Sequence, residues 1–332
     1  MVSLKDIAKE CNVTVATVSK ALNDKNDIGE QMKEYIKETA KKMGYYPNSA
    51  ARALKTKRSY NIGILFVDGT NSGITHEFFS QILEQFKDSV EQKGYDIAFV
   101  NRYIGENSMS YLEHCRYRAF DGVLIACIDF NQPQVLELVE SDIPTVTIDH
   151  LYPGHVSVMS DNAHGMEDLL SYITEKGHEK IAYIYGQDCT VTYNRLDSFK
   201  HFMESRNLPI KEEYLIQGKY NDVEKAAMLT KQLMELPEPP TCIVYCDDMA
   251  CIGGMSELNK MGLSIPEDVA VAGYDGVKVS QMIYPKLTTV KQDVEGMGKE
   301  AARKMIELIE DKSKRKEEII RLKSHLISGE SV

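Results

Sequence analysis

The 332-residue sequence has no tryptophan, no low-complexity tract and no apolar run long enough to cross a bilayer. Its seven cysteines are odd in number and include no C-x-x-C pair, so neither a disulfide framework nor a redox motif is expected. Cys242, Cys246 and Cys251 form the one cluster, and buried apolar packing is expected there rather than metal binding. Because the first residues also lack the apolar core of a secretory signal, we expect a cytoplasmic protein that does not contact a membrane.

The sequence also lacks the short motifs of several large enzyme classes. It contains no G-x-x-x-x-G-K-[ST] phosphate-binding loop, no G-x-S-x-G nucleophile motif and no metal-spaced pair of histidines. We therefore predict no catalytic residues, no metal and no cofactor.

Charge divides the chain into two unequal parts. Residues 1–60 carry 12 Lys and Arg against seven Asp and Glu, whereas the remaining 272 residues carry 27 against 43. A basic N-terminal part attracts phosphates, and an acidic body repels a polyanion. This distribution is compatible with DNA binding at one end, although a few lysines can also be an ordinary solvated surface.

The N-terminal part begins with two short amphipathic helical patterns joined by a tight turn. Ser3 and Asp6 have capping-box spacing, and an apolar face follows at Leu4, Ile7, Ala8 and Cys11. After Asn12-Val13, Thr14 can cap a second helix that ends at Leu22. Two helices joined in this way predict a helix-turn-helix, whose second helix lies in the DNA major groove. A third helix follows, for which Gly29 is an acceptable N-cap.

From Tyr60 onward, apolar strand-like runs alternate with amphipathic helices, and the pattern restarts after residue 161. Such strands specify parallel sheets covered by helices on both faces. The body is therefore predicted to consist of two doubly wound α/β lobes with a ligand cleft between them. The expected strands are 61–67, 95–100, 122–126, 144–149, 180–186, 241–245, 269–275 and, as the last, 318–322.

Three aspartates, Asp149, Asp248 and Asp275, follow or end predicted strands. In open α/β sheets, ligands bind beyond the carboxyl ends of the strands. These residues are therefore candidates for a polar binding site.

Taken together, these features resemble the lactose-repressor/galactose-repressor (LacI/GalR) family of bacterial transcription regulators over nearly the whole chain. The resemblance depends on motifs that occur in this order: Lys5-Asp6-Ile7-Ala8, Val13 to Lys20, Gly44-Tyr45-Tyr46-Pro47-Asn48, Ala51-Arg52-Ala53-Leu54, Asp247-Asp248-Met249-Ala250, Gly273-Tyr274-Asp275 and Pro285 to Val290. It implies a helix-turn-helix head with a hinge helix, followed by a bilobed body like that of periplasmic binding proteins.

In that family the second head helix reads the major groove. The resemblance assigns this role to Val15, Ala16 and Lys20, with Thr14, Thr17 and Ser19 able to reach phosphates. Val15 and Ala16 can make only apolar contacts, so Lys20 is the best candidate for a guanine or phosphate contact. Alternatively, Val15 is a core residue of a three-helix head.

The resemblance also implies a hinge helix that starts at Asn48 and ends near Lys55. So short a helix is marginal alone, and we expect it to fold when paired with its dimer mate in the minor groove. Leu54 occupies the position of the wedge that kinks the duplex. Arg52 and Lys55 would hold phosphates, and the small Ala51 allows the two hinge helices to approach closely.

In the body, Arg195 and Asp248 match the family's effector-binding arginine and aspartate, and Asp149 matches a polar group of the first lobe. Phe78, Phe79 and Tyr220 match aromatic wall positions, while Asp275 and His76 are further candidates. A carboxylate and an arginine fork suit a neutral ligand rich in hydroxyl groups, which indicates a sugar. Phe79 could instead be core, Asp275 a turn cap and Asp248 an N-cap.

The implied organisation is a helix-turn-helix domain over 1–46, a hinge over 47–59 and an effector-binding and dimerisation domain over 60–332. Lobe 1 is expected at about 60–161 plus 293–312, and lobe 2 at about 162–292 plus 313–328. No heptad tail follows, so we expect a homodimer rather than a tetramer. It would bind a palindromic double-stranded operator, repress carbohydrate-utilisation genes and be released by the sugar.

Three other functions remain open. A nucleobase co-repressor could occupy the same cleft, because related regulators bind purines there. A sugar-modifying enzyme would need catalytic motifs that the sequence lacks, and a solute-binding protein would not carry a DNA-binding head.

Overall fold

The computed structural model describes residues 2–46, 53, 56, 58–67 and 73–332. The chain forms two compact units, Met1–Ser59 and Tyr60–Val332. No helix in the described residues has the length and apolar character needed to span a membrane.

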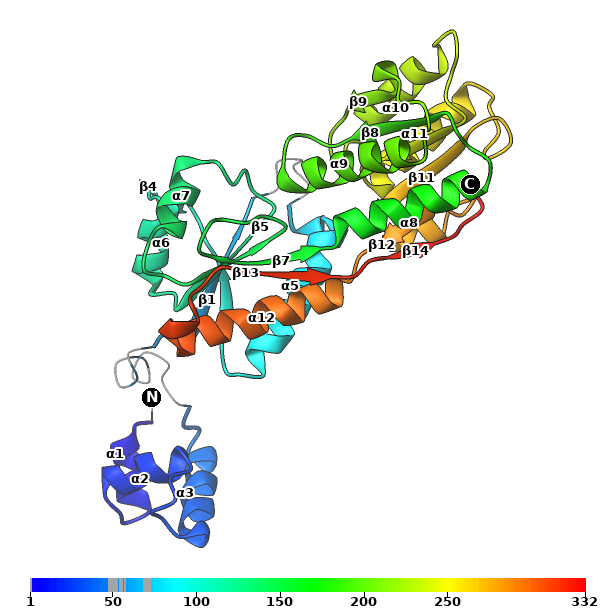
Figure 1. Cartoon of the computed structure of the whole chain (residues 1–332). Helices are drawn as coiled ribbons and strands as arrows, with labels where there is room; N and C mark the ends of the chain where they lie inside the picture. The colour runs from blue at the N-terminus through cyan, green and yellow to red at the C-terminus, as the bar shows by residue number, and fades with distance from the viewer. Residues whose placement is uncertain (1, 47–52, 54–55, 57, 68–72) are drawn as a thin grey trace. The chain divides into compact units, whose positions relative to one another are not determined.

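Residues 2–46 of the first unit form three helices that share one small apolar core (Figure 1): α1 (Leu4–Glu10), α2 (Val15–Leu22) and α3 (Glu30–Lys42). Ser3 and Asp6 form the expected capping box, and the Thr14 hydroxyl accepts a hydrogen bond from the amide of Thr17 at 3.1 Å. The core includes Ile7, Val18, Ala21 and Ile36. Val15 is 41% exposed, so it is available for DNA and is not part of this core.

The second unit contains two six-stranded sheets. The first has the order β13-β7-β6-β5-β1-β2, and all its pairs are parallel. The second has the order β14-β12-β11-β10-β8-β9, and only the β12–β14 pair is antiparallel. Two doubly wound lobes are therefore present, as the alternation of strands and helices predicts.

The strands of the first sheet are β1 (Asn61–Phe66), β2 (Asp96–Phe99), β5 (Gly122–Ala126), β6 (Thr145–Ile148), β7 (Val156–Ser160) and β13 (Glu318–Leu322). Those of the second are β8 (Ile181–Tyr185), β9 (Leu215–Gln217), β10 (Cys242–Tyr245), β11 (Ala270–Asp275), β12 (Thr288–Lys291) and β14 (His325–Ile327). A small hairpin of β3 (Tyr103–Ile104) and β4 (Asn107–Ser108) stands apart.

Helices cover both faces of each sheet (Figure 1). In lobe 1, α5 (Glu77–Glu91) and α12 (Val294–Glu310) pack on one face, and α6 (Tyr111–Arg118) and α7 (Pro133–Val139) on the other. In lobe 2, α8 (Asn162–Glu175) and α9 (Thr190–Ser205) cover one face, and α10 (Val223–Met234) and α11 (Asp248–Lys260) the other. The described part of the body also includes four short 3₁₀ segments: η1 (Gly73–Thr75), η2 (Glu212–Tyr214), η3 (Lys278–Gln281) and η4 (Lys312–Lys314).

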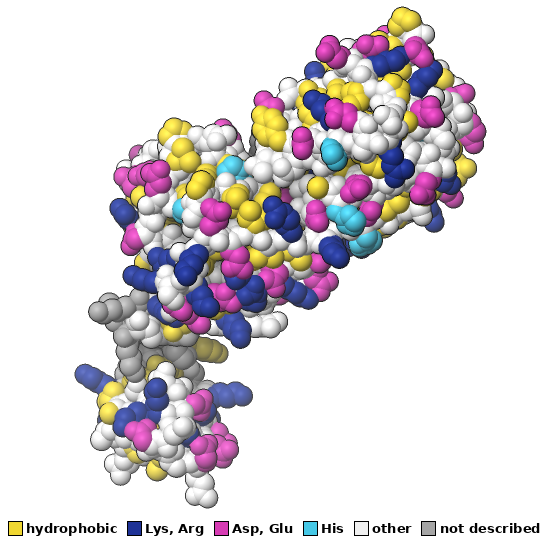
Figure 2. Space-filling view, in the orientation of Figure 1, with side chains coloured by type: hydrophobic (Ala, Val, Ile, Leu, Met, Phe, Trp, Pro, Cys, Tyr) yellow, Lys and Arg dark blue, Asp and Glu magenta, His cyan; other side chains and the backbone are white. Residues whose placement is uncertain are grey.

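Outward side chains of α12 form ion pairs along the helix, where Arg303 contacts Glu300 and Glu307 at 2.6 Å each. Figure 2 shows positive and negative side chains interspersed over this face. The mixture is typical of a solvated helix surface, in which each such pair contributes only a few tenths of a kcal/mol, roughly.

The chain passes between the lobes three times, after β7, after β12 and after β13. This arrangement corrects one predicted boundary. Residues 313–328 were assigned to lobe 2, but β13 pairs in parallel with β7 of lobe 1, and only β14 joins lobe 2. Without β13, β7 would be an unpaired edge strand of the first sheet. The chain that follows α12 therefore pairs with β7 before it crosses to lobe 2.

Candidate effector site between the lobes

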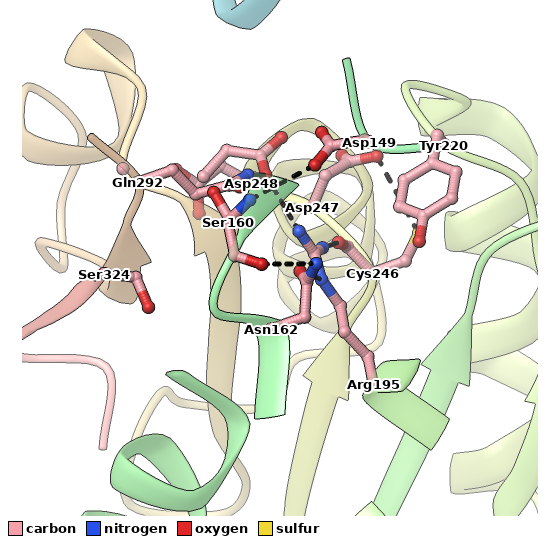
Figure 3. A network of polar contacts seen from close by, with 12 residues as sticks. Asp149, Ser160, Asn162, Arg195, Tyr220, Cys246, Asp247, Asp248, Gln292 and Ser324 are labelled. Carbon is pink, nitrogen blue, oxygen red and sulfur yellow. Dashed lines mark hydrogen bonds and ion pairs between the residues drawn. The ribbon is translucent and has the colours of Figure 1, made fainter. Parts of the chain in front are cut away.

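Arg195 is the centre of the body's polar network (Figure 3). It projects from α9 and is only 2% exposed. Its Nε donates to Asn162 Oδ1 at 2.7 Å, one of its terminal nitrogens donates to the Cys246 carbonyl at 2.9 Å, and the other lies 3.8 Å from Asp275 Oδ1. Its guanidinium carbon lies 3.5 Å from the centre of the Tyr274 ring, which is a cation–π contact. A buried charge is tolerated here because each of these groups compensates part of the lost hydration.

Asp149 and Asp275 approach this network from the two lobes, at the ends of β6 and β11. Both have left-handed backbones, with φ of 59° and 105°, a conformation that is uncommon for non-glycine residues. Burial raises the pKa of Asp149 to about 6 and that of Asp275 to about 7, although Arg195 acts in the opposite direction on both. The two carboxyls are therefore partly protonated near neutral pH and can donate as well as accept hydrogen bonds.

Sequence reasoning missed three members of this network. Asp247 is the N-cap of α11 and accepts from the amides of Ala250 and Asn221 at 2.7 and 2.6 Å, and burial raises its pKa. Asn162, at the start of α8, holds Arg195, and Gln292 Nε2 donates to Asp275 Oδ1 at 2.6 Å. The one available signal was position, because all three follow the ends of strands.

Asp248 makes its hydrogen bonds away from Arg195, and its effector-binding role stays a prediction. It is 0% exposed, its Oδ1 accepts from the Thr289 hydroxyl at 2.5 Å, and its Oδ2 accepts from the Val277 amide at 2.8 Å. Both oxygens are therefore used within lobe 2, where they tie α11 to β12 and the segment after β11. The structure places Asp247, one residue earlier, toward Arg195 instead.

The aromatic candidates differ in their placement. Phe78 is 5% exposed and belongs to the core under the first sheet, so it is not a wall of the cleft. Phe79 is half-buried and packs edge-on against Phe66 and against His76, which is the N-cap residue of α5. The Tyr220 hydroxyl lies 3.0 Å from the Thr192 hydroxyl. Thr192 is on α9, one turn before Arg195. Phe79, His76 and Tyr220 therefore remain candidates.

The predicted DNA-reading residues that the structure describes lie on α2 or at its N-cap. Thr14, Val15, Ala16 and Lys20 are exposed, while Thr17 and Ser19 are half-buried. Lys20 forms an ion pair with Asp27 at 2.5 Å, and an exposed pair of this kind is weak enough to yield to a phosphate. Asn48, Ala51, Arg52, Leu54 and Lys55 lie outside the described residues.

Comparison with known proteins identifies both units. Residues 3–48 match the model for bacterial regulatory proteins of the lacI family, and residues 170–332 match a periplasmic binding protein-like domain. A curated relative, "Probable HTH-type transcriptional repressor ExuR" of Bacillus subtilis, is 30% identical over 325 residues, which are 96% of this chain and 95% of the relative. This chain belongs to the LacI family.

Solved structures of LacI-family proteins share the fold. The Lac repressor dimer bound to operator and the anti-inducer ONPF has a TM-score of 0.83 at 21% identity, covering 99% of this chain and 98% of the other. A complex of the transcriptional regulator CelR with cellobiose has a TM-score of 0.74 at 23% identity and covers both chains completely.

Membership confirms the central sequence prediction. LacI-family proteins are DNA-binding regulators with an effector-binding body, so this protein is a transcription regulator and not an enzyme. Among the described residues, no group of three or more His, Cys, Asp or Glu side chains is arranged to hold a metal ion.

The raised pKa of Asp275 predicts that the unfolding free energy depends on pH. Because its folded pKa of about 7 exceeds the ordinary value of 3.8, its contribution is fully present below pH 3.8 and is lost as the pH rises through 7. Asp275→Asn removes this dependence. Between pH 5.5 and 7.5, the unfolding free energy of the wild type should therefore fall by about 2 kcal/mol relative to the variant.

Urea unfolding at the two pH values measures this difference. Asp197→Asn, at an exposed position of α9, is the matched control; it keeps Asp275 and should lose stability between the two pH values as the wild type does. If the difference between wild type and Asp275→Asn does not change with pH, the carboxyl is already ionised at pH 5.5 and the assigned environment is wrong.

Proposed function

We propose that this protein is a cytoplasmic, homodimeric repressor that binds a near-palindromic operator and is released by a neutral sugar held between the lobes. The DNA contacts are assigned to Thr14, Val15, Ala16, Thr17, Ser19 and Lys20 on the head, and to Asn48, Ala51, Arg52, Leu54 and Lys55 in the hinge. The effector contacts are assigned to Arg195, Asp149, Asp275 and Asp247, with Tyr220, Phe79 and His76 beside them.

One observation supports the sugar most directly: the Arg195 fork lies among carboxyls that come from both lobes (Figure 3). Carboxyls and a guanidinium make directional hydrogen bonds to neighbouring hydroxyl groups. An anionic ligand would meet three carboxyls against one guanidinium, so a neutral polyol fits the local charge better. The CelR–cellobiose complex shows that a protein of this fold can bind a sugar.

Regulation requires that the ligand prefer one arrangement of the lobes. Polar contacts already cross between them, since His150 Nδ1 lies 3.0 Å from the Thr190 hydroxyl and Glu77 Oε1 accepts from the Lys278 amide at 2.9 Å. Such contacts are individually modest, roughly 1 kcal/mol each. A sugar that binds one arrangement of the lobes more tightly than the other can therefore shift this equilibrium, and the coupling to DNA affinity is reciprocal.

A two-stage experiment tests the proposal. A thermal-shift screen compares neutral sugars, hexuronates and purines, and a duplex selected from a random pool is then titrated by gel shift with and without the ligand found. A neutral sugar should raise the melting temperature and weaken operator binding. Binding of a purine that strengthens the complex would establish co-repression instead, and failure to bind any duplex at low ionic strength would refute the proposal.

Leu54→Ala tests the hinge assignment. Loss of a wedge that stabilises the kinked duplex should cost about 1–3 kcal/mol, or roughly five- to 150-fold in operator affinity, while sugar binding is unchanged. Gel shift and calorimetry measure the two quantities separately. An equal loss of both would mean that Leu54 supports the body rather than the DNA complex.

A further inference from the structure

Tyr274 is a buried aromatic residue of β11 that lies beside Arg195 and is 0% exposed. The Arg195 guanidinium carbon is 3.5 Å from the centre of its ring, so the guanidinium lies over the ring face. The other partners, Asn162, Cys246 and Asp275, contact the guanidinium through its nitrogens. The N–H groups of a guanidinium point within its plane, so these contacts do not support its face. Tyr274 supplies that support.

The hydroxyl end of Tyr274 reaches the last chain crossing between the lobes. A Cβ on Gly165, in the first turn of α8, would lie 2.3 Å from Tyr274 Oη and 2.5 Å from Ser324 Oγ. Ser324 is 6% exposed and lies on the last crossing, between β13 and β14. Because only a glycine leaves room for both hydroxyl groups, Tyr274, α8 and the last crossing form one close-packed contact.

The Tyr274 hydroxyl is buried and has no hydrogen-bond partner among the described residues. The neighbouring Ser324 hydroxyl donates elsewhere, to the Asp161 carbonyl at 3.5 Å. A buried polar group without a partner is costly, and a small shift that brings the two hydroxyl groups into hydrogen-bond geometry would remove this cost. The free energy of the last crossing therefore depends on where the Tyr274 ring lies.

We propose that Tyr274 is a positioning residue that couples Arg195 to the last chain crossing. Its ring supports the guanidinium and its hydroxyl contacts the crossing, so a ligand that moves Arg195 changes the contact between Tyr274 and Ser324. The lobes are joined by the crossings, and this contact therefore links ligand binding to the arrangement of the lobes. The inference rests on the proposed function in one respect, which is that the effector contacts Arg195.

A second route from Arg195 to the crossings passes through Asn162. Arg195 Nε donates to Asn162 Oδ1, and Asn162 directly follows Asp161 on the first crossing. The Asp161 amide donates to the Leu322 carbonyl at 2.8 Å, which joins the first crossing to the last. This route does not involve the Tyr274 hydroxyl, so removal of that hydroxyl distinguishes the two routes.

A double-mutant cycle between Arg195→Lys and Ser324→Ala tests the coupling by urea unfolding of the full-length protein at one concentration. Arg195→Lys keeps the charge but removes the planar group that faces Tyr274. With Tyr274 present, the effect of the double variant on the unfolding constant should differ from the product of the two single effects at least fivefold, which is about 1 kcal/mol. In the Tyr274→Phe background, which keeps the ring and removes only the hydroxyl, this difference should fall below twofold.

Tyr183→Phe is the matched control background. Tyr183 is also 0% exposed, its hydroxyl is buried without a partner among the described residues, and its ring stacks on Phe199. The fivefold difference should persist there. If Tyr274 were merely structural, Tyr274→Phe would lower the stability of every variant and leave the coupling unchanged.

Three outcomes would overturn the proposal. They are a difference below twofold with Tyr274 present, a difference retained in the Tyr274→Phe background, and an equal loss in the Tyr183→Phe background. The second would assign the coupling to Asn162. The cycle uses no ligand, so failure of every sugar to release the operator would refute the proposed function without changing this result.

Discussion

Replacing Arg195 with alanine is expected to abolish the response to the effector and to lower the unfolding free energy of the body by about 3–5 kcal/mol. The substitution leaves Asn162 Oδ1 and the Cys246 carbonyl without their donor. It also removes the one positive charge of the network beside Asp149, Asp247 and Asp275. Operator binding should persist, because the DNA-reading residues lie in a separate compact unit.

Urea unfolding and gel-shift titration measure the two effects. Arg206→Ala is the matched control, since this exposed arginine follows the same helix and only stacks over Phe202. Arg195→Lys keeps the charge but not the planar fork, so it should recover part of the stability and little of the ligand affinity. A variant Arg195→Ala that still releases the operator on addition of sugar would place the effector elsewhere.

Asp248→Ala should destabilise lobe 2 by roughly 2–5 kcal/mol, because it leaves the buried Thr289 hydroxyl and Val277 amide unpaired. Asp248→Asn should be milder. Burial raises the pKa of Asp248 well above its ordinary range, so a neutral side chain of the same shape is tolerated there. At a temperature where each variant is folded, the affinity for the sugar should change less than about threefold. A change of that size is below 1 kcal/mol in binding free energy, which corresponds to roughly fivefold.

Asp197→Ala, at an exposed position on α9, controls for the loss of a carboxylate alone and should have little effect on stability. Thermal unfolding and sugar titration of the three variants distinguish a structural role from ligand contact. If Asp248→Ala were stable and had lost sugar binding, the aspartate would contact the ligand as the sequence motif suggests, and the role assigned from the hydrogen bonds would be wrong.

Much of this protein was predictable because the relevant signals are local. Capping residues and apolar periodicity placed α1 and α2, and apolar runs placed most strands to within one or two residues. The strands β7, β9, β12 and β14 of the two sheets were missed, as was the β3–β4 hairpin. β7 contains the polar Ser157 and Ser160, β12 begins with two threonines, and β9 and β14 have three residues each, so none has a clear pattern.

The amino-acid sequence alone determined the three-helix head, the two α/β lobes and the family, and it placed Arg195, Asp149 and Asp275 at a common site. Tertiary packing decided which of two adjacent aspartates faces that site. Asp247 caps α11 and lies toward Arg195, while Asp248, the first residue of α11, accepts hydrogen bonds from Thr289 and Val277. Packing also decided that Phe78 joins the core and that β13 returns to lobe 1. These outcomes depend on partners that are distant along the chain, 29 and 41 residues away for Asp248 and on another strand for β13, which periodicity and spacing do not encode.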